Sequence, residues 1–338
     1  MRRYRSAFLY AIGLLASTQL GAKELVISTP GGSFLDEIAR CKVESFKAAT
    51  GTAVTLVANS STQTAAKLRA TKGSPEFDVV YVDSELAVPL AKEGLLEKVD
   101  TSALKSKPDV LPQAFDPNGY FTQMMTAATI IAYNPKLIDK PSSWADVLDP
   151  KYKGKIALPD ITGTSGVQFL LAVNRMKGGT LDNLDPGFAA ITAIKDNAVM
   201  FYTQADQLVP LFERGDIVMA PWYPDRVGSA ADAGVSVTVS YPKEGAVGIR
   251  PTIAIPAGTK NKEEALKYID NDLAEGPQKC FADRKYGGPV NTKVHLSDKA
   301  ATILPSAEDV AKLWYPDLAV VAAKRPEWTA RWQREITR

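Results

Sequence analysis

Small polar residues that suit a charged ligand follow a predicted buried strand in the middle of the chain. The motif Gly163-Thr164-Ser165-Gly166 comes after the apolar residues 156–158 and opens a second apolar run. Threonine and serine hydroxyls accept hydrogen bonds from amides that the first turn of a helix leaves free. Such a helix start also carries partial positive charge, which suits a carboxylate, phosphonate or phosphate. The alternative is an ordinary strand-to-helix turn that caps itself, so the rest of the chain has to decide.

Further candidates lie at predicted strand ends nearer the N-terminus. Strand-type stretches end near residues 28, 57 and 82, and a helix-type pattern follows each of them. This alternation predicts a mostly parallel α/β sheet, in which ligands bind outside the carboxyl ends of the strands. The residues there also suit plain turns. The candidates for ligand contact are Gly32, Ser33, Phe34, Ser60, Asp83 and Glu85.

The N-terminus has the layout of a secretory signal peptide. Arg2, Arg3 and Arg5 precede an apolar run at 7–16 that is too short to span a bilayer as a stable anchor, and we expect cleavage after Ala22. The formal charge of +2 includes these three arginines, so the mature chain would carry −1. A near-neutral protein does not favour nucleic acid as a partner.

The two cysteines, Cys41 and Cys280, are expected to form a disulfide, because export leads to an oxidising compartment. Two unrelated buried thiols are the alternative. The single histidine, His295, belongs to no Cys/His cluster with metal-ligand spacing. Neither a zinc site nor a Ser–His–Asp triad is indicated, and we expect no metal and no cofactor.

Several stretches of the mature chain resemble one known family. The most specific is Trp144-Ala145-Asp146-Val147-Leu148-Asp149-Pro150-Lys151-Tyr152-Lys153-Gly154-Lys155. Others are Phe77-Asp78-Val79-Val80, Ala132-Tyr133-Asn134, the residues 254–262 and Gly288-Pro289-Val290-Asn291. With the leader, they make the chain similar to the periplasmic solute-binding proteins of ABC importers, in particular the spermidine/putrescine-binding branch.

The resemblance implies an α/β, two-lobed periplasmic-binding-protein fold of type II-like topology. Two mixed sheets flanked by helices would be joined by two hinge strands, near 126–133 and 248–255, and would close over a ligand. After the signal peptide 1–22, the first lobe would hold 23–127 and 252–305 and the second lobe 128–251. The segment 306–338 would form a helix on the second lobe. The implied protein is a periplasmic monomer that passes a small molecule to an ABC permease and catalyses no reaction.

The chain departs from the polyamine-binding pattern at two places. Polyamine binders of this family carry an acidic pair at the start of the helix after the second-lobe strand, and a Trp and an Asp just before the second hinge strand. Here the first place has no acid, and Arg250 stands at the second. An ammonium group in a closed cleft without its carboxylate loses several kcal/mol. We therefore expect an anionic group, held by Thr164, Ser165 and Arg250 or Arg226. The alternative for Arg250 is a salt bridge on the hinge surface.

Other residues complete the expected pocket. Trp222 matches a family position whose ring stacks on the ligand, although it can equally fill the second-lobe core. Tyr223 can add a wall or a hydroxyl donor, and Tyr202 and Gln204 can face the cleft. An acid at Asp83 or Glu85 would receive an ammonium group. An anion site opposite an acid predicts a zwitterion such as γ-aminobutyrate, an aminophosphonate or an opine-like compound.

The C-terminal aromatic residues are expected in the core. Trp314, Tyr315, Trp328 and Trp332 suggest a helix packed on the second lobe, while Lys324 and Arg325 suggest a solvated face. Three other functions stay open: polyamine binding, ferric-ion binding, which in a related branch uses an adjacent tyrosine pair that this chain lacks, and an exported enzyme, for which no nucleophile elbow is present.

Overall fold

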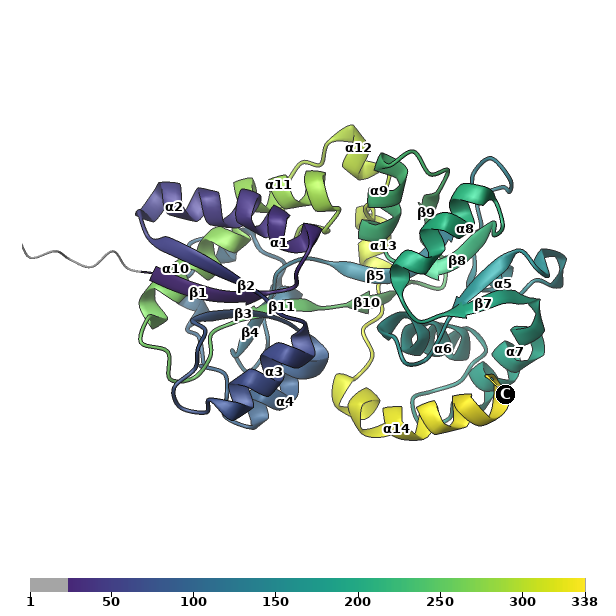
Figure 1. The fold of residues 1–338 in the computed structure, drawn as a ribbon, viewed down its shortest axis with the longest axis horizontal. Coiled ribbons are helices and arrows are strands. Elements are labelled where there is room, and N and C mark those ends of the chain that lie inside the picture. The colour runs from purple at the N-terminus through teal and green to yellow at the C-terminus, as the bar shows by residue number, and fades with distance from the viewer. Residues whose placement is uncertain (1–23, 338) are drawn as a thin grey trace, which may run out of the picture.

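The chain forms two α/β lobes that lie side by side (Figure 1) in a computed structural model that describes residues 24–337. The first sheet has the order β2-β1-β3-β11-β4, and the second has the order β10-β5-β8-β6-β7 with β9 paired to β5. The first sheet consists of β1 (Glu24–Thr29), β2 (Ala53–Ala58), β3 (Val79–Asp83), β4 (Phe121–Gln123) and β11 (Pro251–Ala254). The second consists of β5 (Ala127–Tyr133), β6 (Ile156–Pro159), β7 (Ala198–Tyr202), β8 (Met219–Trp222), β9 (Thr238–Ser240) and β10 (Val247–Ile249).

Both sheets are mixed, which confirms the expected fold class. β1 runs parallel to β2 and β3, while β11 is antiparallel to β3 and β4. In the second sheet β6 is parallel to β7 and β8, and β5 is antiparallel to β8, β9 and β10. Each sheet therefore combines parallel crossover units with antiparallel strands that arrive from another part of the chain.

Helices flank the sheets of both lobes. Those of the first lobe are α1 (Ser33–Ile38), α2 (Glu44–Thr50), α3 (Ser61–Ala70), α4 (Ser84–Lys92), α10 (Lys262–Leu273) and α11 (Glu275–Lys285). Those between β5 and β10 are α5 (Trp144–Val147), α6 (Thr164–Met176), α7 (Asp185–Ile194), α8 (Leu208–Arg214) and α9 (Pro224–Asp232). The last part of the chain forms α12 (Asp298–Ala301), α13 (Ala307–Lys312) and α14 (Leu318–Glu335).

Short helical turns join these elements. A π-helical turn, η1 (Ala39–Val43), links α1 to α2, so the helix-type pattern after β1 forms one run with a widened turn in its middle. Gly51, at a φ of 72°, ends α2 in the left-handed conformation that glycine adopts without strain. The 3₁₀ turns are η2 (Thr101–Ala103), η3 (Lys107–Asp109), η4 (Pro112–Ala114), η5 (Pro150–Tyr152), η6 (Lys195–Asn197) and η7 (Ala205–Gln207).

The chain crosses between the lobes at two neighbouring strands. One crossing lies between β4 and β5 and the other between β10 and β11, and β5 pairs with β10 in the middle of the molecule (Figure 1). The second crossing, at Arg250, falls within the predicted hinge stretch 248–255, whereas the first, at 124–126, ends where the predicted stretch 126–133 begins. The exact lobe boundaries stay predictions. Ile303 and Leu304, from the end of the predicted return segment, pack in the second-lobe cluster.

The C-terminal helix α14 runs along the second lobe, and its first half reaches α4 of the first lobe (Figure 1). Trp328 and Trp332 are buried in the core of the second lobe, where the Trp332 ring meets Phe188 and Phe201 edge to face. In the first lobe, Cys41 and Cys280 form the expected disulfide between η1 and α11. The predicted signal peptide lies outside the described residues. No helix within 24–337 is long and apolar enough to cross a membrane.

Candidate functional site

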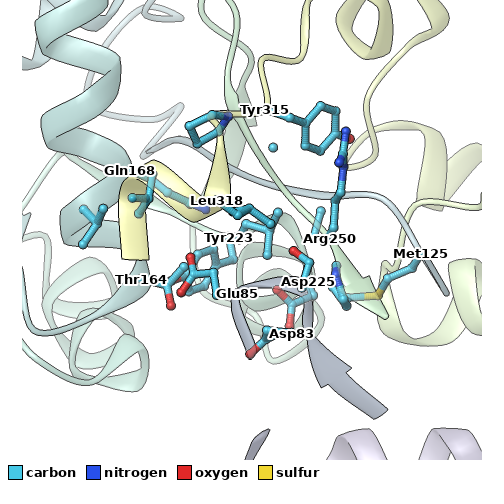
Figure 2. Close-up of a pocket in the computed structure, with 18 of the residues that line it drawn as sticks. Asp83, Glu85, Met125, Thr164, Gln168, Tyr223, Asp225, Arg250, Tyr315 and Leu318 are labelled. Carbon is cyan, nitrogen blue, oxygen red and sulfur yellow. The ribbon is translucent and has the colours of Figure 1, made fainter. Parts of the chain in front are cut away.

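A cavity of about 300 Å³ lies between the two lobes (Figure 2). Both lobes, both crossings and the C-terminal segment contribute to its wall. Of the residues expected from the sequence, Phe34, Asp83, Glu85, Thr164, Tyr223, Arg226 and Arg250 line it. Gly32, Ser33, Ser60, Ser165, Gly166, Tyr202 and Trp222 do not. Its volume lies at the lower end of the range for small-molecule sites.

One carboxylate in the cavity has no basic partner. Asp83 ends β3 and precedes α4, and its carboxylate accepts a hydrogen bond of 3.0 Å from the Ser61 hydroxyl. Asp83 is reached by solvent through the cavity, yet protein surrounds it closely enough that lost hydration raises its pKa. Among residues 24–337, no lysine or arginine nitrogen forms an ion pair with it. Asp83 is therefore a free anionic group at the cavity wall.

The other two carboxylates of the cavity are paired. Glu85, in the first turn of α4, lies 3.5 Å from the Arg325 guanidinium of α14. Burial raises the pKa of Glu85, and Arg325 offsets part of that shift. Asp225, in the first turn of α9, lies 3.7 Å from Arg226 and 3.8 Å from Lys285. Asp225 is an acid of the second lobe that the sequence analysis missed.

Arg250 is a cationic side chain of the cavity that forms no ion pair with a carboxylate of residues 24–337. It lies at the crossing between β10 and β11, where its guanidinium sits 4.3 Å from the centre of the Tyr315 ring. Its Nε is buried and has no hydrogen-bond partner in the described part of the chain. The ion pairs of the described chain do not include Arg250, whereas Arg226 pairs with Asp206 at 3.1 Å. A buried guanidinium nitrogen without a partner is costly, so Arg250 is suited to an anion from outside the chain.

The two unpaired charges lie apart across the cavity. Figure 2 shows Asp83, Glu85 and Asp225 in the lower part of the view, with Glu85 beside Thr164, while the Arg250 guanidinium extends away from them toward Tyr315. Apolar side chains form much of the remaining wall: Phe34, Met125, Val167, Leu171, Leu318 and Val321. The cavity therefore offers one free acid, one free base and an apolar lining.

The start of α6 differs from the expected anion site. Thr164 lines the cavity, but α6 begins after Gly163 with no side-chain cap. Burial raises the pKa of the Tyr223 phenol to about 12, and the neighbouring Ser165 hydroxyl and amide offset part of that shift. A Cβ atom on Gly166 would lie 2.0 Å from the Asp160 carbonyl oxygen, so this glycine allows close backbone packing. Thr164 therefore faces the cavity, whereas Ser165 lies next to Tyr223 and does not line the cavity.

Trp222 lies in the core and not at the cavity wall. Its ring is fully buried and stacks on Phe212 with a centroid distance of 5.9 Å. Successive residues at a strand end point to opposite faces, so Trp222 turns into the lobe and Tyr223 turns to the cavity. The Tyr202 hydroxyl is likewise buried and donates to the Pro221 carbonyl at 2.5 Å.

The glycine and serine candidates of the first lobe have structural roles. Ser60 caps α3 through a reciprocal pair of hydrogen bonds with Gln63. Gly32 precedes α1 at a φ of 64°, a conformation that favours glycine, and Ser33 begins that helix. Among these candidates and their neighbour Phe34, only Phe34 lines the cavity. Its ring packs edge to face against Phe281.

Several lining residues were missed by sequence reasoning. Asp225 follows Pro224, and proline at the first position of a helix was a usable signal that Asp225 lies in a first turn at a strand end. Gln168 lines the cavity and accepts a hydrogen bond from the Thr129 hydroxyl. Tyr315 was expected in the core but lines the cavity, and Arg325 was expected on a solvated face but pairs with Glu85. The residues 24–337 hold no cluster of His, Cys, Asp and Glu that suits a metal ion.

The model of the bacterial extracellular solute-binding protein family matches residues 42–306. The chain belongs to this family. This solute-binding protein is 30% identical over 304 residues to the spermidine/putrescine-binding periplasmic protein of Salmonella typhimurium, covering 85% of this chain and 86% of that one.

A second relative and a solved structure agree with this assignment. The gamma-aminobutyric acid-binding protein of Pseudomonas aeruginosa is 24% identical over 314 residues, with 88% and 86% of the two chains covered. The crystal structure of an ABC transporter from Clostridium perfringens matches with a TM-score of 0.81 and 26% identity, and 92% of this chain and 99% of that chain are covered.

Proposed function

We propose that this solute-binding protein captures a small zwitterion with one ammonium and one acidic group, such as γ-aminobutyrate. The observation that carries the proposal is the pair of unpaired charges in one cavity, Asp83 on the first lobe and Arg250 at the crossing. Asp83 would accept from the ammonium group, and Arg250 would hold the acidic group through charge-assisted hydrogen bonds. An aminophosphonate or an opine-like compound carries the same two groups.

The same charges argue against a diamine. A second ammonium group placed near Arg250 would meet an unpaired positive charge in a partly dehydrated cavity, and such like-charge contacts cost several kcal/mol. Two of the three carboxylates already have basic partners, Glu85 with Arg325 and Asp225 with Arg226. A polyamine would therefore find one free acid instead of two.

We further infer that the mature protein acts in the periplasm as a monomer, after cleavage behind Ala22, and delivers its solute to an ABC permease without chemistry. The family and the names of its relatives support this role. The lobes would close by rotation at the two crossings, with the ligand held between them.

Isothermal titration of the purified, ligand-stripped protein with γ-aminobutyrate and with putrescine tests the proposal. We expect micromolar or tighter binding of γ-aminobutyrate, which corresponds to about −8 kcal/mol, and weak or no binding of putrescine. Heat released by putrescine alone would favour the second candidate, a polyamine-binding protein. That candidate rests on the three carboxylates of the cavity.

A further inference from the structure

The C-terminal helix α14 follows the last strand of both sheets in the sequence, and it contacts both lobes. Its second half is fixed to the second lobe, where Trp328 and Trp332 are buried and Arg331 pairs with Asp185 at 2.6 Å. Pro326 lies inside the helix between the two halves and cannot donate a helical hydrogen bond. The first half of α14 is fixed to the second lobe as well, because Val321 is buried in the second-lobe core and Lys324 donates to the Leu181 carbonyl at 3.2 Å.

Residues of this first half complete the cavity. Leu318 and Val321 line it, and Arg325 lies about one turn beyond Val321. The Arg325 guanidinium lies 3.5 Å from the Glu85 carboxylate of the first lobe and donates to the Thr162 carbonyl of the second lobe at 3.0 Å. One side chain from outside both sheets thus contacts both lobes beside the ligand site.

The position of Arg325 determines how many free carboxylates the cavity presents. Asp83 and Glu85 are neighbours on β3 and α4, and each is oriented toward the cavity (Figure 2). With Arg325 in place, Glu85 has a basic partner and Asp83 has none. Without Arg325, the first lobe would present two free carboxylates to the ligand.

We propose that Arg325 is a positioning residue that acts through Glu85 and makes the site select one ammonium group over two. This inference rests on the proposed function, because it explains how a cavity with three carboxylates prefers a zwitterion. Leu318 and Val321 would contact the apolar part of the ligand beside this pair. The C-terminal segment would therefore contribute to selectivity in addition to the two lobes.

The test is a set of titrations with γ-aminobutyrate and putrescine on the full mature protein and its variants. The variants are Arg325→Gln, Glu85→Gln, the double variant, and Arg331→Gln as a matched control. Arg331 lies on the same helix and forms ion pairs of the same kind, but with Asp185 and Glu335 away from the cavity. The titrations are run at about pH 8, well above the ordinary glutamate pKa of about 4.3, to favour the ionised form of Glu85, whose pKa burial raises.

We expect Arg325→Gln to raise the affinity for putrescine relative to γ-aminobutyrate by at least about tenfold. The Arg331→Gln control should leave this ratio unchanged. In the Glu85→Gln background, adding Arg325→Gln should not change the ratio, since the charge through which it acts is gone. A merely structural contact between the lobes would weaken both ligands together and would leave the ratio where it was, which would overturn the proposal.

The two proposals fail in different ways. If the wild-type protein binds putrescine and not γ-aminobutyrate, the proposed function is wrong. If the wild type prefers γ-aminobutyrate but the ratio does not move in Arg325→Gln, only the role of Arg325 is wrong. Thermal unfolding of each variant separates misfolding from a changed ratio, and Arg325→Lys should restore the wild-type ratio in part because it returns the charge.

Discussion

At the scale of single residues, pairing decides what each charge in the cavity can do. Within residues 24–337, Asp83 and Arg250 have no partner of opposite charge, whereas Glu85, Asp225 and Arg226 have one. In an ion pair within the chain, each charge is largely neutralised by its partner. A paired charge therefore attracts a charged ligand group less strongly than an unpaired charge does. The charges expected on the ligand therefore follow from the unpaired charges of the cavity, and not from the total number of its acidic residues.

Substituting the two cavity arginines separately tests this distinction. Arg250→Gln should weaken γ-aminobutyrate binding by about 10- to 100-fold, because a hydrogen bond to a charged group contributes about 1.5–3 kcal/mol. Arg226→Gln should have a smaller effect, since Arg226 is engaged by Asp206 and Asp225. Titration calorimetry on both variants measures the difference. Equal losses would show that pairing does not distinguish the two guanidinium groups.

The raised pKa of Asp83 predicts a pH dependence of binding. Only the ionised carboxylate attracts an ammonium group, so affinity should be full above the raised pKa and should fall as the pH drops through it. This window lies above the ordinary aspartate value of about 3.9. The charged or titratable neighbours are Glu85 and Tyr223. Titrations between pH 4 and pH 8 should show a weaker dependence in Asp83→Asn than in the wild type.

At the scale of elements, the C-terminal segment is held against β10 by close packing. Gly248 of β10 lies so near Tyr315 that an added Cβ would be 2.3 Å from the ring atom Cε1. The Gly248 amide also donates to the Trp314 carbonyl at 2.8 Å. Tyr315 in turn supports the guanidinium of Arg250. The position of Arg250 therefore depends on a segment that follows it by more than sixty residues.

Gly248→Ala should displace Tyr315 and disturb Arg250. Overpacking of this kind costs about 1–3 kcal/mol, and we expect lower stability together with weaker ligand binding. Gly276→Ala is the matched control, because a Cβ atom there meets nothing within 4 Å. Urea unfolding and titration calorimetry measure the two effects. Normal affinity in Gly248→Ala would mean that Tyr315 does not support the site.

A buried ion pair fastens η1 to α10 in the first lobe. Lys42 Nζ donates to the Asp272 carbonyl at 2.7 Å and lies 3.5 Å from its carboxylate, and neither side chain is exposed. Burial lowers the pKa of Lys42 and raises the pKa of Asp272. Tyr81 donates to the same carboxylate at 2.7 Å. The pair joins parts of the chain that are far apart in the sequence.

Lys42→Met should lower the free energy of unfolding by about 3–5 kcal/mol, because it leaves the Asp272 charge buried without its partner. Lys42→Met/Asp272→Leu should cost less than the sum of the two single substitutions, since it removes both charges. Urea unfolding monitored by circular dichroism measures all three variants. Additive losses would show that the two charges do not interact.

The sequence predicts the elements better than it predicts the site. Hydrophobic periodicity places most of the strands and the helices that follow β1, β2 and β3, and Asp83 and Glu85 follow from their position at a strand end. It does not separate Trp222 from Tyr223, because a shift of one residue along a strand exchanges the faces. Tyr315 and Arg325 were misplaced for another reason. Their contacts with Arg250 and Glu85 depend on how the C-terminal segment packs against the two lobes. The local hydrophobic pattern of the sequence does not predict this packing.

At the scale of the whole molecule, the site exists only where three parts of the chain meet. The first lobe supplies Asp83 and Glu85, the second supplies Thr164 and Tyr223, and the C-terminal segment supplies Leu318 and Val321. Closure of the lobes would bring the free acid and the free base onto the two ends of one ligand. This arrangement links hinge motion to ligand charge, because a molecule with only one of the two groups satisfies only one side of the cavity.

The most direct measurement is a titration of the wild-type protein with γ-aminobutyrate and its two truncated forms. Butylamine keeps the ammonium group that Asp83 would bind, and butyrate keeps the carboxylate that Arg250 would bind. We expect γ-aminobutyrate to bind at least about 100-fold more tightly than either truncated form, because each loses one charge-assisted contact. Butylamine or butyrate binding as tightly as γ-aminobutyrate would contradict the requirement for both charges.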